Sequence, residues 1–362
     1  MNSLRGVMGS LSELINDSRL HKFISSSSHK YTSFLSLFPA HFFQFSGIEV
    51  SIYNSSAHSD LLLELKPSTL SWKYPLRNYG MNIPSKVLEI LKYYLLLPQA
   101  SNPLRNIWLE YDWESFNNKV FTKITPSLFI GSKSNPSITD NISTLPFHLK
   151  KFFSSVPTSC IELILNHAMN TNLFLTQAGY MQGRNIPSTR LVFTSKSMQN
   201  IDNFLNRMNM NIFHDENFYS FVNKSQPSLF AIGIDISDDG ITSQNYGIEI
   251  YKPWNDAYKW RVMIDIVEEH YGQSIKLKAL KNVFFENRFF PSIYKNPYSY
   301  IEEPHQVLIN YSYVSPHHFK FSFSPDCLTS IQPKIKAYIG FLFPHLLRQN
   351  NVISLSQAYI PN

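Results

Sequence analysis

Short segments in which apolar and polar residues alternate recur along the chain in pairs, and each pair encloses a stretch rich in Gly, Asn, Asp or Pro. Alternation of this kind is typical of β-strands, and those four residue types are typical of hairpin turns. The pattern predicts about five antiparallel β-hairpins, which begin roughly sixty residues apart. Their strands are expected at residues 47–53 and 61–66, 107–113 and 120–125, 173–181 and 189–194, 231–237 and 246–252, and 307–313 and 319–323.

The fifth hairpin is expected to turn at Ser315-Pro316, and an extra strand should follow it at residues 334–340. Segments with helical spacing lie between hairpins, at residues 85–97, 197–208 and 258–271. These elements predict an α/β protein in which hairpins alternate with helices.

A sheet of about ten twisted strands tends to curl, and closing it gives an antiparallel barrel with helices outside and a polar lumen. A β-sandwich of two hairpin groups would show the same alternation. Residues 1–30 are Ser-rich and are expected to form an N-terminal arm or short helix. Residues 31–362 would then form a single, repeat-built barrel domain.

Sorting the predicted strands by face separates two kinds of surface. In the strand around residue 249, Ile248 and Ile250 share one face, while Gly247, Glu249 and Tyr251 share the other. An antiparallel sheet can show such a mixed face to water. Bulky aromatic residues beside the charges, and glycines that make room, favour instead a lumen that holds a ligand.

The composition restricts the partners of the protein. The net charge is +6, from 32 basic and 26 acidic residues, which favours an anionic partner such as a diphosphate or an acidic peptide. The basic residues do not form runs, so nucleic acid is not expected. Aromatic residues make up 15% of the chain and suit a pocket for a flat or apolar ligand.

The location is expected to be cytoplasmic. Only two cysteines occur, Cys160 and Cys327, far apart and without a CxxC motif, as in a reducing compartment. The first ten residues are mixed and no apolar core follows, so no secretory signal is expected. The longest apolar stretch, residues 93–97, is too short to span a membrane.

Five α-β-β-α units around a ten-stranded antiparallel barrel resemble the ABBA prenyltransferases, which have the PT-barrel fold. Strands of that family alternate a basic residue with Tyr. The segment most similar to them here is Lys336-Ala337-Tyr338, and Arg190-Leu191-Val192-Phe193 and Glu249-Ile250-Tyr251 are looser matches. The resemblance implies a transferase of natural-product or peptide-modifying biosynthesis. It would move an isoprenoid from an allylic diphosphate to an aromatic small molecule or a peptide side chain.

The resemblance also implies roles for residues of the mixed face. Cations would hold the diphosphate, since phosphate recognition favours Arg and Lys; the candidates are Lys123, Arg190, Lys320 and Lys336. Aromatic rings would shield the carbocation through cation–π attraction; the candidates are Trp108, Tyr180, Tyr251 and Tyr338. A carboxylate would take the released proton or orient the acceptor; Glu110 is the first choice, followed by Asp112, Asp235 and Glu249.

No metal site and no required cofactor are expected, and any Mg²⁺ would be shared with the diphosphate. The chain lacks the Walker A, GxGxxG, HExxH, GxSxG and DDxxD motifs. His317 and His318 are neighbours at the start of a predicted strand, so their side chains should point to opposite faces.

The sequence departs from the family pattern at Glu249, where a cation would suit a diphosphate better. Two alternatives therefore stay open. One is a non-catalytic module that binds a peptide or another ligand within a peptide-tailoring biosynthetic system. The other is a cyclase on the same scaffold. The diphosphate clamp would be excluded if its four cations faced bulk solvent.

Overall fold

The structure is a computed structural model that describes residues 43–54, 59–65, 104–112, 126–132, 156–181, 188–210, 215–240, 242–252, 257–285, 289–293, 309–324 and 333–342. The expected N-terminal arm at residues 1–30, the helix at 85–97 and the strand at 120–125, which includes Lys123, lie outside these residues.

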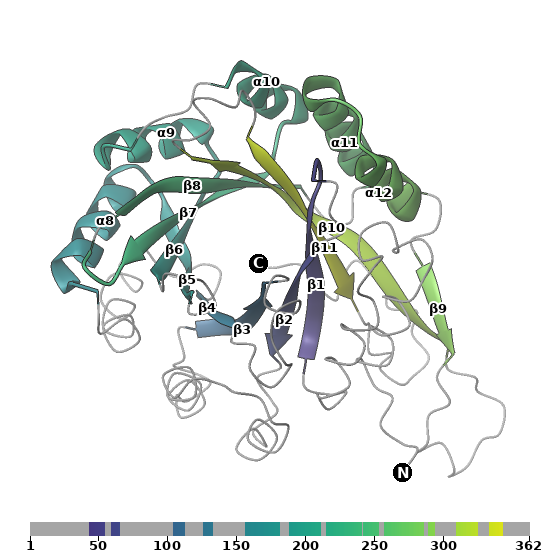
Figure 1. The fold of residues 1–362 in the computed structure, drawn as a ribbon, viewed down its shortest axis with the longest axis horizontal. Helices are drawn as coiled ribbons and strands as arrows, with labels where there is room; N and C mark the ends of the chain where they lie inside the picture. The colour runs from purple at the N-terminus through teal and green to yellow at the C-terminus, as the bar shows by residue number, and fades with distance from the viewer. Residues whose placement is uncertain are drawn as a thin grey trace, which may run out of the picture.

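Eleven strands form one sheet among the described residues (Figure 1). They are β1 (Phe43–Ser51), β2 (Ser59–Leu65), β3 (Leu104–Tyr111), β4 (Ser127–Ser132), β5 (Phe174–Tyr180), β6 (Ser188–Ser195), β7 (Leu229–Ser237), β8 (Thr242–Tyr251), β9 (Phe289–Ile293), β10 (Ile309–Phe323) and β11 (Lys334–Leu342).

The sheet closes into a barrel of ten strands. Its order is β11-β1-β2-β3-β4-β5-β6-β7-β8-β10, and β10 pairs in turn with β11. Every neighbouring pair is antiparallel, and β9 pairs with the first part of β10. The predicted closed antiparallel barrel is therefore confirmed, and the β-sandwich alternative is wrong.

The first, third and fourth predicted hairpins are confirmed as β1–β2, β5–β6 and β7–β8. In the second hairpin, β3 pairs with β4, so that Ile107 lies opposite Ile130. The expected partner strand at residues 120–125 lies outside the described residues.

The turn expected at Ser315-Pro316 is wrong, because β10 is one strand that runs through both residues. Ser315 pairs with Gly340 and Pro316 with Ile339, and a β-bulge follows Pro316 before His318 resumes pairing with Tyr338. Pro is tolerated in strands at bulges, where its missing N–H interrupts no ladder bond. The strand expected as an extra, at 334–340, is β11, the second strand of the fifth hairpin.

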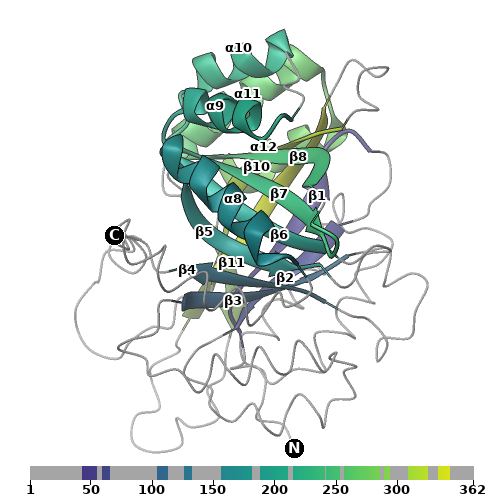
Figure 2. The same ribbon diagram turned by 90° about the vertical axis from the view of Figure 1, so that its left-hand side faces the viewer.

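Helices cover the outside of the barrel beside β5–β8 and β10 (Figures 1 and 2). Within the described residues they are α8 (Thr158–Asn170), α9 (Met198–Arg207), α10 (Glu216–Ser225), α11 (Ala257–Tyr271) and α12 (Ile275–Phe285). The helices predicted at 197–208 and 258–271 are confirmed as α9 and α11. None of the helices in the described part of the chain is long and apolar enough to cross a membrane.

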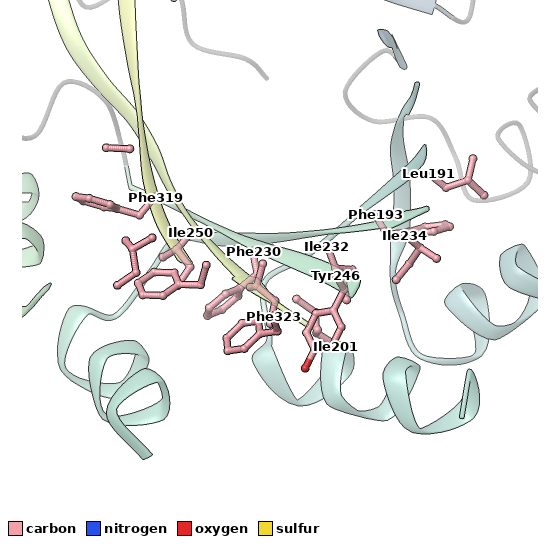
Figure 3. Close-up of a cluster of buried hydrophobic side chains, with 14 of the residues drawn as sticks. Leu191, Phe193, Ile201, Phe230, Ile232, Ile234, Tyr246, Ile250, Phe319 and Phe323 are labelled. Atoms are coloured by element: carbon pink, nitrogen blue, oxygen red, sulfur yellow. The ribbon is translucent and has the colours of Figure 1, made fainter. Parts of the chain in front are cut away.

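The core lies between the outer face of the barrel and the helices (Figure 3). Ile232 and Ile234 of β7 and Phe193 of β6 are fully buried there, beside Ile201 and Phe204 of α9. Burying an Ile or Phe side chain stabilises the fold by about 1.5–3 kcal/mol. Most apolar residues of β6, β7, β8 and β10 face outward to the helices, so the residues that alternate with them face the lumen.

Candidate functional site

Among the described residues, two neighbouring cavities open into the lumen. The larger, about 240 Å³, is lined by Arg190, Asp235, Lys320, Lys334, Lys336 and Glu49, among others. The smaller, about 70 Å³, is lined by Trp108, Phe129, Tyr251, Tyr338, Glu110 and Glu249, among others. We call them the cationic cavity and the aromatic cavity. Arg190 and Lys320 line both, so these two cations stand where the cavities meet.

Arg190 on β6 faces Asp235 on β7, its direct partner in the ladder. Arg190 Nε lies 2.6 Å from Asp235 Oδ1, and Arg190 Nη2 lies 2.7 Å from Oδ2. Bidentate pairs of this kind fix the guanidinium in one orientation. Burial alone would lower the pKa of Arg190, but Asp235 raises it, so the guanidinium keeps its charge.

Lys336 on β11 lies between two carboxylates. Its Nζ is 3.1 Å from Glu49 Oε1 and 3.2 Å from Asp60 Oδ2. Burial would raise the pKa of Glu49, but Lys336 and Lys320 outweigh it and hold this pKa at about 2. Carboxylate oxygens of Glu49, Asp60 and Glu110 lie within 4.8 Å of one another. Lys336 forms ion pairs with two of these three carboxylates, so its ammonium group offsets part of the negative charge of the cluster.

Lys320 on β10 is held less tightly. Its Nζ lies 3.8 Å from Glu249 Oε1, beyond hydrogen-bond distance, and 5.9 Å from the centre of the Tyr338 ring. Its side chain is only 12% exposed. Of the three predicted clamp cations in the lumen, Arg190, Lys320 and Lys336, Lys320 is thus the one that can most easily turn to an added anion.

Glycines of the inner face make room for the lumen side chains. A Cβ added at Gly247 would lie 2.9 Å from Lys320 Cε, and one at Gly233 would lie 3.3 Å from Arg190 Cδ. Gly233 and Gly247 are opposite each other in the β7–β8 ladder. The two cations therefore lie across a pair of glycines, where any larger side chain would push them aside.

The tyrosines of the aromatic cavity are fixed by carboxylates. The Tyr251 hydroxyl donates to Glu249 Oε2 at 2.6 Å, and the Tyr338 hydroxyl donates to Glu49 Oε2 at 2.5 Å. Burial and these carboxylates raise the pKa of both phenols well above the ordinary value, so both remain neutral. Their rings can face a cationic intermediate without themselves losing a proton.

His317 and His318 both line the aromatic cavity, so the expectation that they point to opposite faces is wrong. Their Nδ1 atoms are 2.7 Å apart. The reason is the β-bulge between Pro316 and His318, which inserts His317 as an extra residue and shifts the register of the β10–β11 pair. Bulges of this kind redirect a side chain.

Most of the predicted site residues come together in the lumen. The two cavities include the predicted residues Trp108, Glu110, Arg190, Asp235, Glu249, Tyr251, Lys320, Lys336 and Tyr338. The side chains of Arg190 and Lys320 are 13% and 12% exposed and that of Lys336 is 32% exposed, so none of the three stands fully in bulk solvent. Asp112 is half-buried just beyond the end of β3 and lines neither of these two cavities. Lys123 lies outside the described residues.

Tyr180 does not face the lumen. Its side chain belongs to the core on the helix side, while its neighbour Gly179 pairs with Arg190. A bulge between Leu175 and Gln177 shifts the alternation of β5 by one residue, so Gln177 lines the aromatic cavity. Unbroken alternation from Leu175 would have placed Tyr180 inside.

Sequence reasoning assigned no site role to Glu49, Asp60 or the pair His317 and His318. A signal for Glu49 exists, because a Gly-Ile-acid triplet occurs three times, as Gly47-Ile48-Glu49, Gly233-Ile234-Asp235 and Gly247-Ile248-Glu249. In each triplet the Ile is buried against the outer core and the acid lines a lumen cavity. No comparable signal marks His317.

Comparison with solved structures identifies the fold. The chain is similar to the 6-dimethylallyltryptophan synthase of Micromonospora olivasterospora in complex with DMASPP and Trp, with a TM-score of 0.55 and 10% identity; the match covers 92% of this chain and 97% of that one. A second structure, described as 6-dimethylallyl tryptophan synthase, has a TM-score of 0.56 and 10% identity, over 92% and 96% of the two chains.

No protein-family model and no curated protein sequence matches the chain. At 10% identity, the similarity to these structures concerns the fold. The closed ten-stranded barrel with outer helices is the PT-barrel fold that the layout of the sequence predicted.

Proposed function

We propose that the protein is a prenyltransferase that moves an isoprenoid from an allylic diphosphate to an aromatic acceptor. One observation carries this proposal: a cationic cavity and an aromatic cavity meet in one lumen, with Arg190 and Lys320 at the junction. An allylic diphosphate has the same two parts, a polyanion and an apolar chain, joined at the bond that must break.

In this arrangement the diphosphate occupies the cationic cavity, where Arg190, Lys320 and Lys336 stabilise the charge that develops on the leaving group. The isoprenoid points into the aromatic cavity. There the rings of Trp108, Tyr251 and Tyr338 stabilise the allylic cation, by about 2 kcal/mol per ring when water is excluded.

Donor binding has to compete with the carboxylates that already face the cations. Lys320 is the residue most available for this, because its Nζ is 3.8 Å from Glu249, whereas Arg190 and Lys336 make closer pairs. A diphosphate carries more charge than one carboxylate, so it can draw the flexible lysine across Gly247 towards itself. No step of this binding needs a metal ion, and any Mg²⁺ would enter with the diphosphate.

The acceptor belongs beside the carboxylates of the aromatic cavity. Glu110 is 6% exposed and lines this cavity next to Trp108 on the same strand face. An indole N–H could donate to it, which would orient the ring for attack. The two similar structures are tryptophan-modifying enzymes by their names, one of them in complex with Trp, which supports an aromatic acceptor. The side chain of a peptide is the alternative acceptor.

The other predicted acids have different places. Asp235 is held by Arg190 and so positions that guanidinium, and Glu249 holds the Tyr251 hydroxyl. Asp112 is left with no proposed role.

The test is a reaction of the purified protein with dimethylallyl diphosphate and L-tryptophan. Pyrophosphate release and prenylated tryptophan are measured together, the second by mass spectrometry. A matched pair of variants, Lys320→Ala in the lumen and Lys224→Ala on α10, distinguishes the loss of a site residue from the loss of any one positive charge. Lys224 suits the control because it pairs with Glu269 at the outer surface. We expect activity that Lys320→Ala lowers and Lys224→Ala leaves unchanged. Tight donor binding without any turnover on an acceptor panel would contradict the proposal.

The non-catalytic binding module remains the second candidate, because Arg190, Lys320 and Lys336 each face a carboxylate. A lumen in which charges are already balanced suits a polar ligand such as a peptide. In that case the protein would bind peptides and leave the diphosphate intact. A cyclase would instead convert the donor without any acceptor. The cytoplasmic location stays a prediction.

A further inference from the structure

The aromatic cavity contains two imidazoles that its prenyl-transfer role has not used. His317 is the bulged residue of β10, and its ring is exposed to the lumen. His318 is only 5% exposed and lies behind it. Two adjacent residues of a regular strand could not meet in this way, so the bulge is what brings the rings together.

His318 is held by its neighbours on both sides of β10. Its ring stacks on Tyr338 of β11, with centroids 3.8 Å apart, and lies 4.7 Å from the Tyr251 ring of β8. Its Nδ1 is 2.7 Å from His317 Nδ1. Its Nε2 is buried, has no hydrogen-bond partner among the described residues, and lies 3.7 Å from Glu249 Oε2.

These contacts determine which nitrogen atoms of the two imidazoles carry a proton. Only one of the two Nδ1 atoms can carry the shared proton. The negative charge of Glu249 favours an N–H at the facing Nε2 of His318, which leaves the lone pair of His318 on Nδ1. His317 then donates its Nδ1–H to His318, and its own lone pair is on Nε2 of the lumen-exposed ring.

We propose that His317 and His318 form a proton relay, which takes the proton displaced from the aromatic acceptor and delivers it to Glu249. The relay rests on the proposed prenyltransferase activity. The C–O bond of the donor breaks, a C–C bond to the acceptor ring forms, and the ring then loses the proton from the same carbon. His317 Nε2 accepts this proton, and the Nδ1 proton of His317 passes to His318 Nδ1 across 2.7 Å. The Nε2 proton of His318 then passes to Glu249, which lies 3.7 Å away and must approach to accept it.

Lys336 and the phenols of the lumen are poorly suited to take this proton, and Glu110 is assigned to orienting the acceptor. The carboxylates of Glu49 and Asp60 keep Lys336 protonated: burial alone would lower its pKa, but they raise it above the ordinary value. The phenols are neutral and already donate to carboxylates. The imidazoles are neutral as well, because their position inside the barrel lowers both pKa values. The pKa of His317 falls to about 4, and that of His318 falls well below the ordinary value. A weak base suffices, because a protonated aromatic ring is a strong acid.

The experiment uses the full chain with dimethylallyl diphosphate and two forms of L-tryptophan, one unlabelled and one deuterated at every indole ring carbon. Rates of prenylation are compared for the wild type, His317→Phe and a matched variant on the outer helix α11, His270→Phe. His317→Phe keeps an aromatic ring in the lumen and removes the proton acceptor. His318→Phe is the second variant, and breaks the relay at its buried member.

In the wild type and His270→Phe, we expect equal rates with both forms, because proton loss is fast. In His317→Phe and His318→Phe, prenylation should fall on the order of 100-fold, and the deuterated acceptor should react more slowly still. Pyrophosphate release should persist, since donor ionisation does not use the relay. A merely structural role would slow both reactions and produce no isotope effect.

Normal prenylation by both variants, with equal rates for the two forms of tryptophan, would overturn the relay and leave the prenyltransferase proposal standing. A wild type that prenylates neither form would overturn the prenyltransferase proposal for this acceptor, and the relay with it.

Discussion

At the scale of single residues, the inner-face glycines differ in what surrounds them. An added Cβ at Gly179 would lie 2.5 Å from the Phe129 ring, whereas at Gly233 it would lie 3.3 Å from the flexible Arg190 side chain. We predict that Gly179→Ala lowers the free energy of unfolding by about 1–3 kcal/mol, as overpacking does, and that Gly233→Ala costs clearly less. Urea denaturation of the two variants measures this difference. Equal losses of stability in the two variants would contradict the prediction and mean that the Phe129 ring can move away.

The stability of the folded protein should depend on pH through Glu49. Its pKa is about 2 in the folded protein, against 4.5 for the free side chain, because Lys336, Lys320 and Tyr338 outweigh the opposing effect of burial. A folded-state pKa below the unfolded one contributes stability that is complete above pH 4.5 and is lost as pH falls towards 2. One pKa unit corresponds to about 1.4 kcal/mol, so the contribution is on the order of 3 kcal/mol.

We therefore predict that the wild type loses stability steeply over this interval and that Glu49→Gln flattens the loss. Chemical denaturation at a series of pH values tests it. Glu269→Gln is the control, because Glu269 forms an exposed pair with Lys224 on the outside of the barrel. The same acid profile in Glu49→Gln and the wild type would show that Glu49 is not the responsible group.

Most of the residues that line the lumen could be predicted from the sequence, because strand alternation assigns each residue to one face of the sheet. Glu249 and Lys320 were placed correctly in this way. Tyr180 and His317 were not, and the physical reason is the same for both. Each follows or forms a β-bulge, which shifts the alternation by one residue. A bulge depends on the partner strand, so a single strand read alone cannot reveal it.

At the scale of elements, the helix caps offer a matched pair. The Asp215 side chain accepts from the backbone N–H of Asn217 at 2.9 Å at the start of α10, and also accepts from the Tyr271 hydroxyl at 3.1 Å. Ser197 stands at the same position before α9 without a side-chain capping bond. We predict that Asp215→Ala costs about 1–2 kcal/mol and Ser197→Ala much less. Thermal or urea unfolding of the two variants measures this difference, and equal losses of stability would contradict the capping role of Asp215.

The strands were more predictable than their connections. The alternation located β1, β2, β5, β6, β7 and β8, while the turn expected at Ser315-Pro316 is a continuous part of β10. Turn residues are a local signal, and here the ladder with β11 outweighs it: Ser315 and Pro316 each keep a partner across the strand pair. Pairing partners far apart in sequence thus decided where the fifth hairpin bends.

At the scale of the whole molecule, the barrel followed from the regular spacing of the hairpins, since about ten antiparallel strands with one apolar and one mixed face close most simply on themselves. Closure of the barrel also explains how the site is assembled. It brings Glu49 of β1, the first described strand, to Lys336 of β11, the last, at 3.1 Å. No local pattern in the sequence could show that contact, because it exists only when the ring of strands is complete.

The central claim is that the cationic cavity binds the diphosphate of an allylic donor while the aromatic cavity holds its hydrocarbon. The most direct test is the shift in melting temperature of the wild type and Lys320→Ala with dimethylallyl diphosphate, geranyl diphosphate and inorganic pyrophosphate. At a hundred times the dissociation constant, a ligand adds about 2.7 kcal/mol to the free energy of unfolding. We expect a clear shift with the allylic diphosphates, a smaller one with pyrophosphate, and weaker responses in Lys320→Ala. No shift with any of the three at millimolar concentration would contradict the claim.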